Sequence, residues 1–98
     1  MNIEDLNAVF SALADPTRRG MLAQLADGES NVRALTDSYD ISQPAVSKHL
    51  RVLERAGLIT RTRSGRERIV RINPKPLDGI TKWIDHYAQH WQRQFDAV

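Results

Sequence analysis

The chain has 98 residues, no cysteine and a formal net charge of +2. This length predicts one small domain over residues 1–98, and the absence of cysteine excludes disulfides and thiolate metal sites. No apolar run approaches the roughly 20 residues of a membrane span, and the polar, acidic N-terminus is unlike a secretory signal. We therefore expect a cytoplasmic protein with no membrane partner.

Two helices are expected in the first third of the chain. Apolar residues recur at helical spacing over residues 3–14, which predicts the first helix. Asp15 is the expected N-cap of the second helix, and Pro16 suits its first turn because a missing N–H costs nothing there. This helix would run to about residue 26, where Gly28 can take the left-handed conformation that ends a helix.

A helix-turn-helix is expected over about residues 32–56. Ser30 or Asn31 can cap its first helix, and Ser42 can cap its second, which Gly57 would end. The apolar residues of the second helix recur at i, i+4 and i+7 and predict a buried face, formed by Val46, Leu50 and Leu53.

A β-hairpin and a long last helix complete the pattern. Residues 58–63 and 67–72 are rich in Ile, Val, Thr and Arg, with a turn signal at 64–66, so the hairpin spans about residues 58–72. Two prolines then break the strand before a helix over about residues 77–97. Helices followed by a hairpin predict a mainly α fold with a small β-hairpin, a winged helix-turn-helix with about five helices.

The charge of the chain is concentrated in one region. Residues 1–40 carry three arginines against seven acids, a net charge of −4, and residues 72–98 are neutral. Residues 41–71 carry one lysine and seven arginines against two glutamates, a net charge of +6. Such a patch attracts a phosphate backbone, although a solvated basic face without a partner would show the same composition.

The fourth expected helix has the residue types of a helix that reads DNA bases. It would bury one face and present short polar or basic side chains on the other. Gln can pair with adenine, and Lys or Arg can reach guanine or phosphate. The expected DNA-binding residues of this helix are Ser42, Gln43, Pro44, Ser47, Lys48 and Arg51. An amphipathic surface helix is the alternative interpretation of the same pattern.

The hairpin is crowded with arginine. Five arginines fall within eleven residues, from Arg61 to Arg71, and like charges at this density repel unless an anion is near. Charges that protect a strand edge are the alternative, but one or two suffice for that purpose. Arginine suits phosphate contacts and a narrow minor groove. The expected DNA contacts of the wing are Arg61, Arg63, Arg66 and Arg68.

Three segments carry a family resemblance: ALADPTRRGML, ISQPAVSKHLRVLERAGLI and RSGRERIVRIN. In this order they resemble the ArsR/SmtB family of bacterial winged-helix repressors, over about residues 9–74. The resemblance implies a homodimer that represses transcription from a pseudo-palindromic operator in double-stranded DNA, and it implies a dimer interface made by the first and last helices. The apolar residues expected in that interface are Leu6, Phe10, Ile80, Ile84, Tyr87, Trp91 and Phe95.

The chain departs from the metal-sensing members of the family. Asn31 and Arg33 stand where the resemblance would place the cysteine pair of arsenic and cadmium sensors. His86 and His90 lie on the last helix, where zinc and nickel sensors hold ligands, but the second histidine group of those sensors has no counterpart. These two histidines are weak candidates, so we expect no metal and no cofactor. The sequence does not identify an inducer.

Other function classes receive less support from the residues. Ser47 and His49 are neighbours on one helix and face apart, so they cannot form a nucleophile–base pair. No phosphate-binding loop or metalloprotease motif occurs, and we expect no enzymatic activity. His49 is expected to pack partly buried beside Leu50. A winged-helix module that binds RNA or a protein partner, rather than an operator, remains the alternative function.

Overall fold

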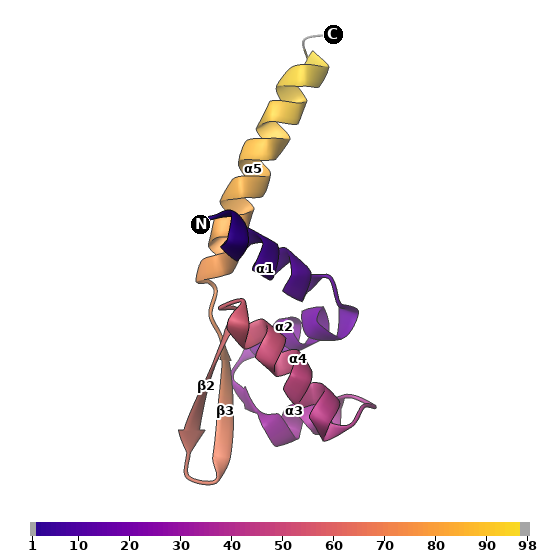
Figure 1. The fold of residues 1–98 in the computed structure, drawn as a ribbon, viewed down its shortest axis with the longest axis vertical. Coiled ribbons are helices and arrows are strands. Elements are labelled where there is room, and N and C mark those ends of the chain that lie inside the picture. Colours follow the sequence, from indigo (N-terminus) through magenta and orange to yellow (C-terminus); the bar gives the residue numbers. More distant parts are fainter. Residues whose placement is uncertain (1, 97–98) are drawn as a thin grey trace.

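The computed structural model describes residues 2–96, the side chain of Ile3 excepted, and over this range the chain forms five helices and three strands (Figure 1). In chain order the elements are α1 (Ile3–Leu13), α2 (Pro16–Asp27), β1 (Ser30–Asn31), α3 (Val32–Ser38), α4 (Gln43–Arg55), β2 (Ile59–Ser64), β3 (Glu67–Ile72) and α5 (Lys75–Asp96). The fold-class prediction is confirmed: α3 and α4 form the helix-turn-helix, and the β2–β3 hairpin is the wing.

Side-chain caps determine where the helices begin. The Asp15 carboxylate accepts the backbone N–H of Arg18 at the start of α2. Asn31, rather than Ser30, caps α3 by accepting a backbone N–H at 2.8 Å, and Ser42 caps α4 in the same way. Each cap satisfies an N–H that the helix itself leaves without a partner.

The two helix-ending glycines differ in conformation. Gly57 has φ +76° and ends α4 in the left-handed region, as expected. Gly28 has φ 161°, which is extended backbone, so the expectation of a left-handed Gly28 was wrong. The chain leaves α2 in an extended conformation because Ser30 and Asn31 pair at once with β3 as the short strand β1.

That pairing makes the wing part of a three-stranded antiparallel sheet in the order β1-β3-β2. Only the hairpin was expected from the sequence. Ser30 faces Val70 and Asn31 faces Ile69 across β1 and β3, so the wing is joined directly to the start of α3. Within the hairpin, Arg63 lies directly opposite Arg68.

One apolar core joins the helix-turn-helix to the wing. Val46, Leu50 and Leu53 of α4 are fully buried, as their spacing predicts, and they share the core with Leu58 and Val70 of the hairpin region. Among the described residues, no polar or charged side chain is fully buried. The core therefore holds α4 rigidly and leaves its opposite face to solvent.

Helix α5 begins two residues earlier than expected, at Lys75, and only its first turns pack on the core. Leu77 is half-buried and Ile80 is buried, whereas every residue of α5 from Thr81 to Asp96 is exposed. The rest of the helix projects from the globular part, giving the molecule extents of 59 × 24 × 24 Å (Figure 1). None of the described helices has both the length and the apolar character needed to cross a membrane.

Candidate nucleic-acid interface

The exposed face of α4 presents the residues expected to contact DNA. Ser42, Gln43, Pro44, Lys48 and Arg51 are exposed, and Ser47 is half-buried. The proline lies in the first turn, where it costs no hydrogen bond. The start of the helix therefore offers polar side chains without any competing intramolecular ion pair among the described residues.

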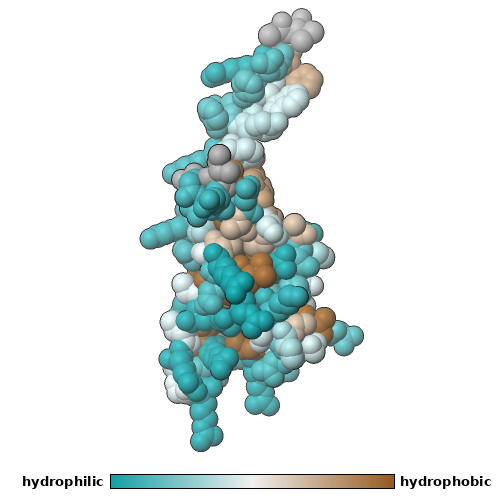
Figure 2. Space-filling view, in the orientation of Figure 1, coloured by the Kyte–Doolittle hydropathy of each residue, from teal (hydrophilic) through white to brown (hydrophobic). Residues whose placement is uncertain are grey.

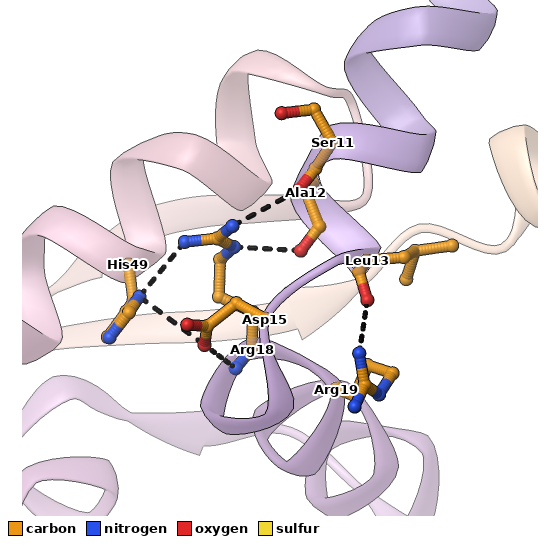
Figure 3. Close-up of polar contacts among 7 residues, drawn as sticks. All are labelled: Ser11, Ala12, Leu13, Asp15, Arg18, Arg19 and His49. Atoms are coloured by element: carbon orange, nitrogen blue, oxygen red, sulfur yellow. Dashed lines mark hydrogen bonds and ion pairs between the residues drawn. The ribbon is translucent and has the colours of Figure 1, made fainter.

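A polar cluster fixes the middle of α4 against α1 and α2 (Figure 3). The Arg18 guanidinium donates to the carbonyls of Ala12 at 2.7 Å and Ser11 at 3.1 Å, both near the end of α1. The same group lies 3.2 Å from Nδ1 of His49 on α4. Because a guanidinium can only donate, this hydrogen bond requires His49 Nδ1 to act as the acceptor. His49 is half-buried as expected, but it serves in a polar cluster.

Asp15 completes this cluster from the start of α2. Its Oδ2 atom accepts the backbone N–H of Arg18 at 2.9 Å and lies 3.9 Å from His49 Nδ1. The backbone hydrogen bond from Arg18 holds the pKa of the Asp15 carboxyl below its ordinary value. The carboxylate is therefore charged at neutral pH and acts mainly as a helix cap.

The arginines at the base of the wing are neutralised by acids from outside the hairpin. Arg61 donates to both oxygens of Glu54 on α4, at 2.9 and 3.3 Å, and this contact holds the pKa of the Glu54 carboxyl below its ordinary value. Arg71 forms an ion pair with Glu29 and donates to Thr62. Of the four wing residues expected to contact DNA, Arg61 is thus the one already held by a partner.

The arginines at the tip of the wing are different. Arg63, Arg66 and Arg68 are exposed, and none forms an ion pair within residues 2–96. Arg63 and Arg68 face each other across the hairpin, an arrangement of like charges that destabilises the strand pair unless an anion is bound. Gly65, with φ +61°, allows the tight turn between them. The wing tip is therefore a compact, unneutralised source of positive charge.

The opposite end of the molecule carries an aromatic stripe. We use this name for Phe10 of α1 with Trp83, Tyr87, Trp91 and Phe95 of α5. Neighbouring rings are in contact along its whole length, with centroids 5.7, 5.4, 6.1 and 5.8 Å apart. All five side chains are exposed, from 38% for Phe10 to 69% for Phe95. In Figure 2, pale and brown atoms accordingly run along the projecting helix, whereas teal atoms dominate the lower end.

The structure changes the list of residues available for a dimer interface. Ile84 is exposed beside the stripe, and Leu6 is half-buried against the core. Ile80 is only 6% exposed and packs in the core of its own chain, which leaves it little surface for the predicted interface. Trp83 was left out of the predicted interface, although it lies four residues before Tyr87 and therefore shares the helical spacing of the stripe. Its edge contact with Phe10, far away in sequence, brings it into the stripe.

The two candidate metal ligands lie on the solvent side of α5. His86 and His90 are both exposed. No group of three or more His, Cys, Asp or Glu side chains arranged to hold a metal ion occurs in the described part of the chain. Nothing in the described structure adds a further ligand to this pair.

Comparisons with known proteins agree with this architecture. The family model described as "Bacterial regulatory protein, arsR family" matches residues 15–61, from the start of α2 into β2. The uncharacterized HTH-type transcriptional regulator YuzN of Bacillus subtilis is 41% identical, over 81% of this chain and 95% of the relative.

The chain belongs to the ArsR family of bacterial regulatory proteins.

Two further relatives of this ArsR-family chain extend the likeness. The transcriptional repressor SdpR of Bacillus subtilis is 33% identical, over 81% of this chain and 88% of the relative. The crystal structure of the ArsR-family transcriptional regulator RHA00566 superposes with a TM-score of 0.88 at 35% identity, covering 94% of this chain and 95% of the other. The predicted function is confirmed at this level: the chain is a DNA-binding transcriptional regulator, and the alternative of an RNA- or protein-binding module is not supported.

Proposed function

We propose that the chain is a homodimeric repressor that binds a pseudo-palindromic operator, with α4 in the major groove and the wing tip on the flanking DNA. The observation that carries this proposal is the combination of an exposed polar face on α4 with three unneutralised arginines at the wing tip. Base edges are read by side chains such as Gln43, Lys48 and Arg51, and phosphates are held by arginine. Repression is also the activity named for SdpR.

The aromatic stripe supports the homodimer. Rings that are exposed together and in contact form an apolar surface of a kind that monomeric proteins rarely leave in water. A twofold axis would bring the same stripe of a second copy onto it, because such an interface is made by the same surface from both subunits. Two copies of α4 would then reach successive major grooves about 34 Å apart.

Selection of bound DNA from a random library tests the proposal. We expect an inverted repeat with half-site centres about 10 base pairs apart, or a multiple of one helical turn. Sedimentation of the free protein should give a dimer. A selected site without symmetry, or a monomer that binds DNA with full affinity, would contradict the homodimer.

The remaining parts of the proposed function follow from DNA binding. The protein would act in the cytoplasm, where a bacterial operator lies, and would have no catalytic activity. An inducer that follows the family pattern would weaken operator binding. The sequence selected from the library would also give a probe for measuring the response to any inducer.

A further inference from the structure

A groove separates the wing tip from the helix-turn-helix. It has a volume of about 520 Å³ and is lined by Asn31, Val32, Arg33, Gln43, Arg63, Arg66, Glu67 and Arg68. These residues come from the start of α3, the start of α4 and the wing tip. Four arginines and one glutamate give the lining a formal charge of +3. We call this feature the arginine groove.

The four arginines of the groove differ from the two arginines at the base of the wing. Arg33, Arg63, Arg66 and Arg68 are all exposed, and none forms an ion pair among the described residues. By contrast, Arg61 and Arg71 at the base of the same hairpin are paired with acids. Several guanidinium groups that line one groove without an ion-pair partner favour an anion that can contact more than one of them.

The geometry of DNA indicates which anion fits. In the proposed complex α4 enters the major groove, and arginines of the wing tip suit the adjacent minor groove. One sugar–phosphate strand separates a major groove from the neighbouring minor groove, so it must pass between α4 and the wing tip. The arginine groove lies between these two elements, with Gln43 of α4 at one side and the wing arginines at the other.

We propose that the arginine groove holds this sugar–phosphate strand, and that Arg33 of α3 is a phosphate contact. This inference rests on the proposed function and adds to it a residue outside both the recognition helix and the wing. Strand β1 positions Arg33, because its pairing with β3 joins the start of α3 to the wing. Glu67 is the one acid in the lining and opposes the phosphate strand.

The inference is tested by the salt dependence of DNA binding for Arg33→Ala. Dissociation constants would be measured between 50 and 200 mM salt for a selected operator and for an unrelated duplex. Each lost phosphate contact lowers the steepness of log K against log salt by about 0.9. The fold-loss of affinity between the two salt concentrations should therefore be about 3.5 times smaller for the variant than for the wild type, per protomer. Because phosphate contacts carry no base information, both duplexes should weaken by the same factor.

Three further variants control the measurement. Arg93→Ala removes an exposed arginine of α5, far from the groove, and should leave the slope unchanged. Arg33→Lys retains the charge and should keep most of the slope. Glu67→Gln removes the opposing charge and should tighten binding to both duplexes. Circular dichroism of each variant establishes that it is folded.

Each outcome decides the inference. A slope for Arg33→Ala equal to that of Arg93→Ala overturns the proposed contact, and if the wild type still binds its operator the proposed function stands. A loss confined to the operator assigns Arg33 to a base and also overturns the contact. A wild-type protein that selects no DNA overturns both the inference and the proposed function.

Discussion

The two ends of this molecule present opposite kinds of surface, one charged and one apolar, and each surface suits a different partner. The wing tip and the exposed face of α4 present cations without an ion-pair partner and polar side chains, whereas α5 presents a stripe of exposed aromatic rings. Contacts of the first kind weaken as salt rises, and contacts of the second kind depend on apolar area and do not. Salt concentration and point charges should therefore separate the two surfaces experimentally.

The largest expected effect comes from a charge placed in the middle of the aromatic stripe. Tyr87→Asp puts a carboxylate between Trp83 and Trp91, and burying it in an interface without a partner is costly. We expect a monomer by sedimentation and a loss of operator affinity of about 100-fold or more, because the two half-sites no longer bind as one unit.

Gln89→Asp provides the matched control for this variant. Gln89 is exposed on α5, two residues from Tyr87, and therefore lies on the other side of the helix. This variant should stay dimeric and bind the operator as the wild type does. If both variants behave alike, the stripe is not the dimer interface.

The next largest effect is expected on the reading face of α4. Lys48→Ala or Arg51→Ala should weaken binding to the selected operator by about 1–3 kcal/mol and relax base preference at the contacted position. Arg55→Ala, at the far end of the same helix, removes equal charge and serves as the control. Competition among single-base variants of the operator measures the change. An unchanged preference would assign the altered side chain to phosphate.

Within the wing, the tip should matter more than the base. Arg66→Ala should lower the salt slope by about 0.9 per protomer and weaken all duplexes alike. Arg61→Ala should have the smaller effect, because Arg61 is held by Glu54 in the free protein and must leave that carboxylate to reach a phosphate. Titrations over a salt series measure both variants. Equal slopes would show that the Glu54 contact does not restrain Arg61.

The smallest expected effect concerns the cap that supports α4 through Arg18. The pKa of Asp15 is lowered in the folded protein, so its charge contributes stability at neutral pH that is lost as the pH falls below about 4. Asp15→Asn keeps an acceptor for the backbone N–H but removes the charge. The gap in urea midpoint between wild type and variant should close as the pH falls from 7 to 3. A gap that is constant with pH would contradict this role.

The sequence predicts the elements whose signals are local. The Ser42 cap, the apolar spacing of α4 and the left-handed Gly57 are each visible within one segment, and together they define the helix-turn-helix. The wing was predictable for the same reason, because two segments rich in residues that favour strands flank a turn that contains glycine. The exposure of the candidate DNA contacts on α4 was predictable because these residues lie on the face opposite to the buried one.

What the sequence could not predict depends on contacts between distant segments. Strand β1 has only two residues and exists through its pairing with β3. The acids that pair with Arg61 and Arg71 lie outside the hairpin, so this neutralisation has no local signal in the sequence. Ile80 shares the helical spacing of the stripe, but periodicity does not tell whether a side chain meets its own core or a second copy.

The Arg18 cluster has a consequence for spacing. One guanidinium is hydrogen-bonded to the end of α1 and contacts the middle of α4, so it links these two helices directly. Phe10 belongs to the aromatic stripe through its contact with Trp83, so α1 would take part in the proposed dimer interface. The distance between the two recognition helices would then depend on how α1 packs against the second copy. A small rotation at that contact would change this distance, so that it no longer matched one helical turn of the duplex.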